Sequence, residues 1–149
     1  MIGISWFGVY LLTEARRVLR EIEEMAEGQF LHIAGPTKGR VLVEVVQKTA
    51  PRRILEVGTL IGYSVILMGK ELSIDSQLIT IEVDEEEAKA AEVNTKKAEI
   101  SAKVEVLVGD ALEILPKLKG KFDLVFIDAT KEEYTDYLRL VEDKLHKGS

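Results

Sequence analysis

Apolar and polar residues alternate at helical spacing in the first part of the chain. Over residues 11–28 apolar side chains recur every three or four positions, and arginine and glutamate fill the opposite face. This pattern predicts an amphipathic helix that ends near Gly28 and packs its apolar stripe in the core or against a dimer partner. The turn-forming residues 32–39 predict a loop, and a second helix is expected over about residues 40–49. The stripe comprises Leu11, Ala15, Val18, Leu19, Ile22 and Met25.

From residue 53 onwards, short apolar runs alternate with amphipathic stretches. The runs have the length and β-branched content of strands, and the stretches between them have helical periodicity. This alternation predicts βαβ units and a parallel sheet with helices on both faces. The expected strands are 53–57, 78–83, 104–108 and 122–127, and the expected helices are 63–72, 84–98, 111–118 and 131–147.

The resulting fold class is α/β, a doubly wound Rossmann-like fold with strands in the order 3-2-1-4. We expect a single domain over residues 1–149, with a helical cap over 1–50 and a βαβ core over 51–149. In this order the fourth strand forms a bare hydrophobic edge, which proteins normally cover. We therefore expect strands five to seven to be missing, and further C-terminal sequence, a homodimer or another partner to cover the edge.

Composition narrows the function classes. The 20 basic and 26 acidic residues give a net charge of −6, which disfavours nucleic-acid and anionic-membrane partners. The chain has no cysteine, which excludes disulfides, Cys-ligated zinc and thiol nucleophiles. The apolar residues 1–12 are too short to span a bilayer and lack signal-peptide features, so we expect them to pack on the body or on a partner. A cytoplasmic location is expected.

The first predicted strand leads into the pattern Glu56-x-Gly58-x-x-x-Gly62. Gly58 permits a sharp turn and close approach of backbone to a ligand, and Gly62 stands where a helix begins. Leu60 occupies the place of the second glycine of a dinucleotide-binding motif, which counts against a pyrophosphate site. By itself the glycine pair is a weak signal, for which a tight βα turn is the alternative explanation.

Acidic residues also follow the other predicted strands. Glu82 ends the second strand, where a carboxylate can accept hydrogen bonds from ribose hydroxyls, although it could be one more solvated charge in an acidic cluster. Asp110 follows the third strand, where it could line an adenine pocket or cap the next helix. Asp128 follows the fourth strand and is placed in the ligand crevice of such sheets. His32 and His146 have no partners at ligand spacing and are interpreted as ordinary histidines.

Together these segments resemble the cation-dependent, catechol O-methyltransferase-like family of S-adenosylmethionine enzymes, over about residues 35–149. The resemblance implies that S-adenosylmethionine binds here, with Ser64 and backbone near Ala34 holding its methionine carboxylate. It also implies that Glu82 binds the ribose. The matching motifs are GPxKG at 35–39, LEVGTxxGYS at 55–64, IE at 81–82, GDA at 109–111 and FDxxFIDAxK at 122–131. The implied cofactor-binding residues are Ala34, Glu56, Gly58, Thr59, Tyr63, Ser64, Glu82, Gly109, Asp110, Ala111 and Asp128.

The resemblance further implies that Asp128 is a Mg²⁺ ligand and that Lys131 is the general base for a substrate hydroxyl. Magnesium prefers oxygen ligands, and chelation of a diol would orient the nucleophilic oxygen and lower its pKa. The family's other ligands, an Asp-Asn pair on the next strand, are not in this sequence. From the residues alone, a cofactor-side or structural role for Asp128 is as well supported as a role as metal ligand. Lys131 is equally well explained as a surface lysine at the start of a helix.

The sequence therefore predicts an S-adenosylmethionine-dependent, Mg²⁺-assisted O-methyltransferase acting on a small molecule or a modified nucleoside. The N-terminal helices are expected to cover the cofactor and to join a homodimer. A non-catalytic cofactor-binding module that needs a partner is one alternative. An NAD-dependent oxidoreductase is the other.

Overall fold

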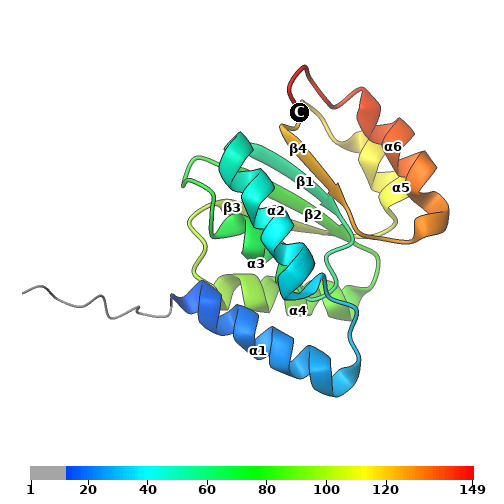
Figure 1. Ribbon diagram of the computed structural model, residues 1–149. Coiled ribbons are helices and arrows are strands. Elements are labelled where there is room, and N and C mark those ends of the chain that lie inside the picture. The colour runs from blue at the N-terminus through cyan, green and yellow to red at the C-terminus, as the bar shows by residue number, and fades with distance from the viewer. Residues whose placement is uncertain (1–12) are drawn as a thin grey trace, which may run out of the picture.

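A parallel four-stranded sheet forms the centre of the computed structural model, which describes residues 13–149 (Figure 1). Its order is β3-β2-β1-β4, which confirms the predicted topology. Val57 aligns with Ile81 on one side and with Ile127 on the other, so the carboxyl ends of the three strands lie together. The expected role of residues 1–12 lies outside the described residues. The strands are β1 (Arg53–Val57), β2 (Gln77–Glu82), β3 (Lys103–Val108) and β4 (Leu124–Ile127).

Helices cover both faces of the sheet, as the apolar strands predicted. On one face Ile54 and Leu78 pack with α2 (Gly35–Thr49) and α3 (Tyr63–Gly69), and α1 (Glu14–Gln29) lies outside α3. On the other face Leu55, Val57, Ile79 and Ile81 pack with residues of α5 and α6. Successive residues of β1 thus enter different cores, as the alternation of side chains along a strand requires. The remaining elements are α4 (Glu85–Lys97), α5 (Ala111–Ile114), η1 (Leu115–Lys117), η2 (Lys131–Glu133) and α6 (Tyr134–Glu142).

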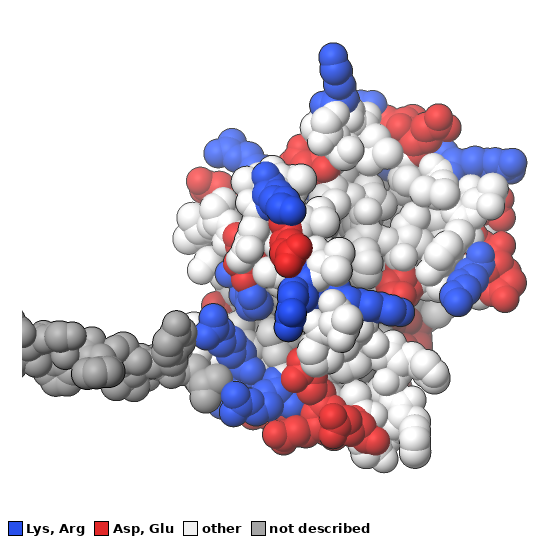
Figure 2. All heavy atoms as spheres, viewed as in Figure 1, with Lys and Arg blue, Asp and Glu red and all other residues white. Residues whose placement is uncertain are grey.

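Helix α1 is amphipathic as predicted, with one correction. The side chain of Thr13 caps its first turn, and Val18, Leu19 and Ile22 are buried. Met25 was expected in the buried stripe but is exposed, and Ala26 is buried in its place. Figure 2 shows basic and acidic side chains side by side near α1, where Arg17 pairs with Glu14 and Glu21. Such exposed pairs contribute little stability.

The predicted loop over residues 32–39 is shorter than expected: residues 32–34 lie outside any helix or strand, but α2 already begins at Gly35. Pro36 stands in the first turn, where a missing N–H costs nothing. Gly39 lies within α2 where this helix packs closely on α3, and a Cβ at this position would come within 2.6 Å of Leu67 Cδ1. Two residues that suggested a turn therefore serve a helix start and a close helix contact.

The last expected helix, over 131–147, is also shorter than predicted. It consists of η2 followed by α6, which ends at Glu142. Beyond it Lys144 turns inward and its ammonium donates to the Leu118 carbonyl at 2.9 Å, while Phe122 and Leu145 form a parallel bridge. His146 Nε2 lies 2.7 Å from Asp123 Oδ1, so the C-terminal segment is attached to the start of β4.

The outer strands are less buried than the inner ones. In β1 and β2 every residue after the first is buried, whereas β4 is half-buried throughout and β3 alternates between exposed and half-buried residues. Among residues 13–149 no strand pairs with the outer edge of β4. A homodimer or another partner on this edge stays a prediction. No helix within the described residues is long and apolar enough to cross a bilayer.

Candidate functional site

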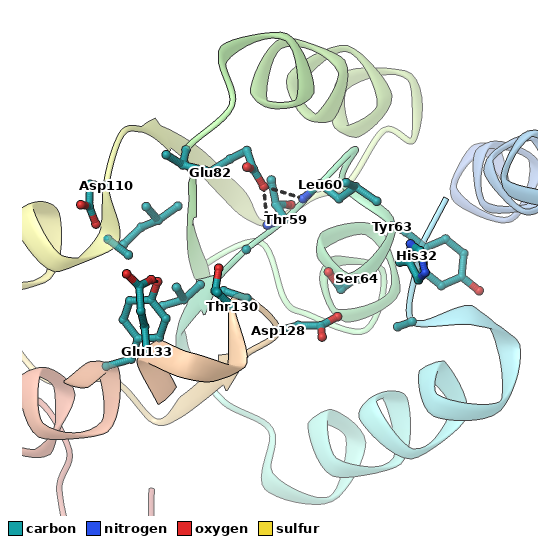
Figure 3. Close-up of a pocket in the computed structure, with 18 of the residues that line it drawn as sticks. His32, Thr59, Leu60, Tyr63, Ser64, Glu82, Asp110, Asp128, Thr130 and Glu133 are labelled. Atoms are coloured by element: carbon teal, nitrogen blue, oxygen red, sulfur yellow. Dashed lines mark hydrogen bonds between the residues drawn. The ribbon is translucent and has the colours of Figure 1, made fainter. Parts of the chain in front are cut away.

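A cavity of about 520 Å³ opens at the carboxyl ends of the strands, between the turns that follow them. This is where doubly wound sheets bind ligands, and the volume is that of a small-molecule pocket. Figure 3 shows Asp110 and Glu133 at one end and Ser64, Tyr63 and His32 at the other. The predicted site residues that line it are Ala34, Gly58, Thr59, Tyr63, Ser64, Glu82, Gly109, Asp110, Ala111 and Asp128.

The turn after β1 forms the floor of the cavity. Gly58 has a φ of +86°, and a Cβ on it would lie 2.5 Å from the backbone oxygen of Asp128. A side chain would therefore be strained and would also push apart the ends of β1 and β4. Thr59 is 3% exposed, and its Oγ1 has no hydrogen-bond partner among the described residues. A buried hydroxyl without a partner at a cavity wall is available to a ligand.

Glu82 fixes this turn from the end of β2. Its Oε2 accepts hydrogen bonds from the backbone N–H of Thr59 at 3.2 Å and of Leu60 at 2.8 Å, and its Oε1 accepts from Asp84 N at 3.1 Å (Figure 3). A carboxylate has about four acceptor sites. Three are used, so the prediction that Glu82 accepts from both ribose hydroxyls requires the release of one backbone contact.

Glu56 does not line the cavity but lies beneath it. It is fully buried on β1, on the α3 face of the sheet, and accepts hydrogen bonds from the hydroxyls of Ser64 and Thr80. Burial raises its pKa to about 7, the neighbouring hydroxyl groups oppose that rise, that of Ser64 most, and the charge of Asp128 adds to it. Ser64 reaches the cavity, so Glu56 acts on a ligand only through it.

The segment that joins α1 to α2 supplies part of the wall at the Ser64 end. Ala34, at the N-cap position of α2, lines the cavity, and so do His32 and Ile33 in the preceding segment. Tyr63 is buried and donates its hydroxyl proton to Glu23 of α1. Tyr63 therefore lines the cavity, while its hydroxyl connects α3 to α1. This hydrogen bond links the first helix of the chain to the site.

At the opposite end, Asp110 caps α5 as one reading of the sequence predicted. Its Oδ1 accepts a hydrogen bond from Leu112 N at 2.8 Å. Gly109 and Ala111 lie beside it in the cavity wall, together with Glu133 and Tyr137 from the segment after β4. The cap and the cavity wall are thus compatible roles for the same carboxylate.

Asp128 and Lys131 are separated by the fold. Asp128 lines the cavity, its backbone N–H donating to the Val57 carbonyl at 2.9 Å, whereas Lys131 begins η2, is exposed and does not line the cavity. No group of three or more His, Asp or Glu side chains in residues 13–149 could hold a metal ion. The described residues therefore do not make a magnesium site around Asp128.

The charge of the cavity follows from its lining. Four carboxylates line it, and no Lys or Arg does so within the described part of the chain. Such a surface favours a cationic or hydrogen-bond-donating ligand and repels an anionic one. The carboxylates are those of Glu82, Asp110, Asp128 and Glu133.

Several lining residues were not predicted from the sequence. Glu133 and Tyr137 lie in the last helical segment, four positions apart. In a helix this spacing is typical of an exposed glutamate next to an aromatic residue of the core, and it does not indicate a binding site. His32 was interpreted as an ordinary loop histidine, yet it stands at the cavity mouth. Only the return of the chain after β4 brings Glu133 and Tyr137 to the site.

Comparisons with known proteins agree with this geometry. The O-methyltransferase family model matches residues 11–149. The catechol O-methyltransferase of Niastella koreensis is 40% identical over 108 residues, covering 70% of this chain and 49% of that protein. The chain thus spans about half the length of the curated relatives it matches.

Solved structures show the same arrangement. An O-methyltransferase from Bacillus cereus in complex with SAH is 33% identical, with a TM-score of 0.79 over 87% of this chain and 62% of that one. TomG from Streptomyces achromogenes, an O-methyltransferase involved in tomaymycin synthesis and solved with SAM, is 31% identical. Its TM-score is 0.78 over 87% of this chain and 60% of that one.

Proposed function

The chain belongs to the O-methyltransferase family, and from that premise we propose that its cavity binds S-adenosylmethionine for methyl transfer to a hydroxyl group. The observation that carries this proposal is the charge of the cavity. Four carboxylates without a lining Lys or Arg in the described chain favour a sulfonium cation. The same lining disfavours the anionic pyrophosphate of NAD, so the oxidoreductase alternative has no support from the cavity.

The residues present fit the shape and polarity of such a cofactor. The cavity volume is sufficient for a nucleoside with an amino-acid tail, and its polar groups lie along its whole length. The unpartnered hydroxyl of Thr59 and the close backbone turn at Gly58 lie between its two ends. We place the adenine at the Asp110 end, the ribose at Glu82 and the methionine part at Ser64.

The bound cofactor would supply an electrophilic methyl group on a positively charged sulfur. The chain's own part is to orient it and exclude water, to which the segment 32–34 and the β1–α3 turn contribute by lining one side of the cavity. The acceptor hydroxyl must lose its proton as the new bond forms. Lys131 as the base and magnesium held by Asp128 stay predictions, as does the substrate class of small hydroxylated molecules or modified nucleosides.

Calorimetric titration of the full chain tests the proposal. S-adenosylhomocysteine is expected to bind with one-to-one stoichiometry, and NADH is expected to give no binding heat. Glu82→Gln is expected to weaken binding about tenfold, because the amide can hold the turn through its oxygen but cannot accept a second ribose bond. The matched control is Glu105→Gln on the exposed face of β3. NADH binding that displaces S-adenosylhomocysteine would overturn the proposal.

A cofactor-binding module without catalysis is a second candidate. It is favoured by one observation: no group of three or more His, Asp or Glu side chains in residues 13–149 could hold a metal ion. A methyl-transfer assay with a simple catechol and magnesium distinguishes the two. Turnover supports the enzyme, whereas tight S-adenosylhomocysteine binding without turnover supports the module.

A further inference from the structure

Glu133 lines the cavity at its Asp110 end (Figure 3). It occupies the N-cap position of α6 but makes no capping bond with its side chain. It is half-buried, and its backbone N–H donates to the Thr130 carbonyl at 3.1 Å. The side chain is thus held at the cavity wall and is not used to begin the helix.

Tyr137 orients this carboxylate from one turn further along α6. Its side chain is 4% exposed, and its hydroxyl donates to Oε2 of Glu133. Burial, together with the neighbouring carboxylates of Glu133 and Asp110, raises the pKa of Tyr137, so the donated proton is retained. Oε1 of Glu133 receives no hydrogen bond from the described residues, which leaves it to a ligand.

The two carboxylates at this end therefore act as acceptors. Asp110 uses Oδ1 for Leu112 N, and no described residue donates to its Oδ2. The single hydroxyl proton of Tyr137 is committed to Glu133. A ligand group that fits this end must donate N–H hydrogen bonds to the carboxylates of Asp110 and Glu133. It must not direct a lone pair at them.

We propose that Glu133 is a specificity-determining residue that accepts a hydrogen bond from the exocyclic amino group of the adenine, with Tyr137 as its positioning residue. This inference rests on the proposed function, which places the base at this end. A 6-amino purine offers two N–H donors to Asp110 and Glu133. A 6-oxo purine would instead set carbonyl lone pairs against two carboxylates, and such a polar mismatch is strongly disfavoured.

The test compares S-adenosylhomocysteine with S-inosylhomocysteine, which differ in the 6-substituent of the base and in the proton that the 6-oxo form carries on N1. Calorimetry on the full chain at one pH gives the ratio of their dissociation constants. Wild type is expected to prefer the adenosyl compound by at least about tenfold. Glu133→Gln is expected to reduce the ratio about fivefold or more, because the amide nitrogen can donate to a 6-oxo group. Glu132→Gln, at an exposed neighbouring position that does not line the cavity, is the matched control and should keep the wild-type ratio.

Tyr137→Phe keeps the buried ring and removes the donated proton. It should also reduce the ratio, by less than Glu133→Gln, which a purely structural role of the ring would not do. An unchanged ratio in Glu133→Gln, with S-adenosylhomocysteine still bound, overturns this inference alone. Failure of wild type to bind S-adenosylhomocysteine overturns the proposed function and this inference with it.

Discussion

Two carboxylates, Glu56 in the centre of the sheet and Asp123 at its β4 edge, show how differently these regions are built. Glu56 is fully buried with two hydroxyl partners, and burial raises its pKa to about 7. Asp123 is half-buried, accepts from the backbone N–H of Arg52 and Arg53 at 2.8 Å, and binds His146. The hydrogen bond from His146 lowers the pKa of Asp123, and backbone N–H groups add to this effect.

The difference shows that a polar group has a different role in the central strands than at the β4 edge. The central strands are buried on both faces, so a polar group there is desolvated and costly, and it remains because it supports the cavity floor. The edge strand is half-buried and is closed by exposed hydrogen bonds to the C-terminal segment. We therefore expect large effects from changes at the centre and small, salt-sensitive effects from changes at the edge.

Gly58→Ala should have the largest effect. The new Cβ would lie 2.5 Å from a backbone oxygen that cannot move without separating β1 from β4, at a φ that side chains rarely adopt. We expect a loss of about 4 kcal/mol in the free energy of unfolding, measured by urea denaturation. Gly28→Ala is the control: it lies in α1 with nothing within 4 Å, and should be neutral or stabilising by about 0.5 kcal/mol. Equal effects of the two changes would contradict the account of the floor.

Glu56→Gln should change how stability depends on pH. The folded pKa of about 7 lies above the ordinary value of 4.5, so the folded state holds its proton more tightly than the unfolded chain. The stability linked to this carboxyl is complete below about pH 4.5 and is lost as the pH rises through 7. Relative to Glu56→Gln, wild type should lose about 3 kcal/mol between pH 4 and pH 8. Parallel stability curves over this range would refute the burial argument.

His146→Gln should have the smallest effect, at the edge. The pKa of His146 is raised by hydrogen bonds to the Lys147 carbonyl and to Asp123, so its contribution is present below its ordinary 6.5 and fades at higher pH. The lowered pKa of Asp123 makes its contribution present above its ordinary 3.8 and lost in stronger acid. The stability difference between wild type and variant should therefore be largest between about pH 4 and 6.5 and should shrink in 1 M salt. A difference that is larger at pH 8 would contradict the pairing.

The central part of the molecule could be predicted from the sequence because its signals are local. Strand-length apolar runs predict the order 3-2-1-4, and the helix expected from residue 84 is present as α4, with Asp84 accepting from Glu86 N and Glu87 N at its start. Residues at the strand ends such as Gly58 and Glu82 could be identified because parallel strands end at a common edge.

The remainder depends on long-range contacts that a linear pattern does not contain. Glu56 carries the motif of a cavity residue, but the alternation of side chains along β1 directs it beneath the floor. Glu133 and Tyr137 reach the cavity only because the chain returns over the sheet after β4. The start of α2 was missed since Gly35 and Pro36 are turn formers that also suit a first helical turn.

A crystal structure of this chain with S-adenosylhomocysteine would test the central claim most directly. The account predicts the adenine between Asp110 and Glu133, the ribose hydroxyls at Glu82 and the amino-acid part beside Ser64. A ligand bound in the reverse direction, or outside the strand ends, would contradict it.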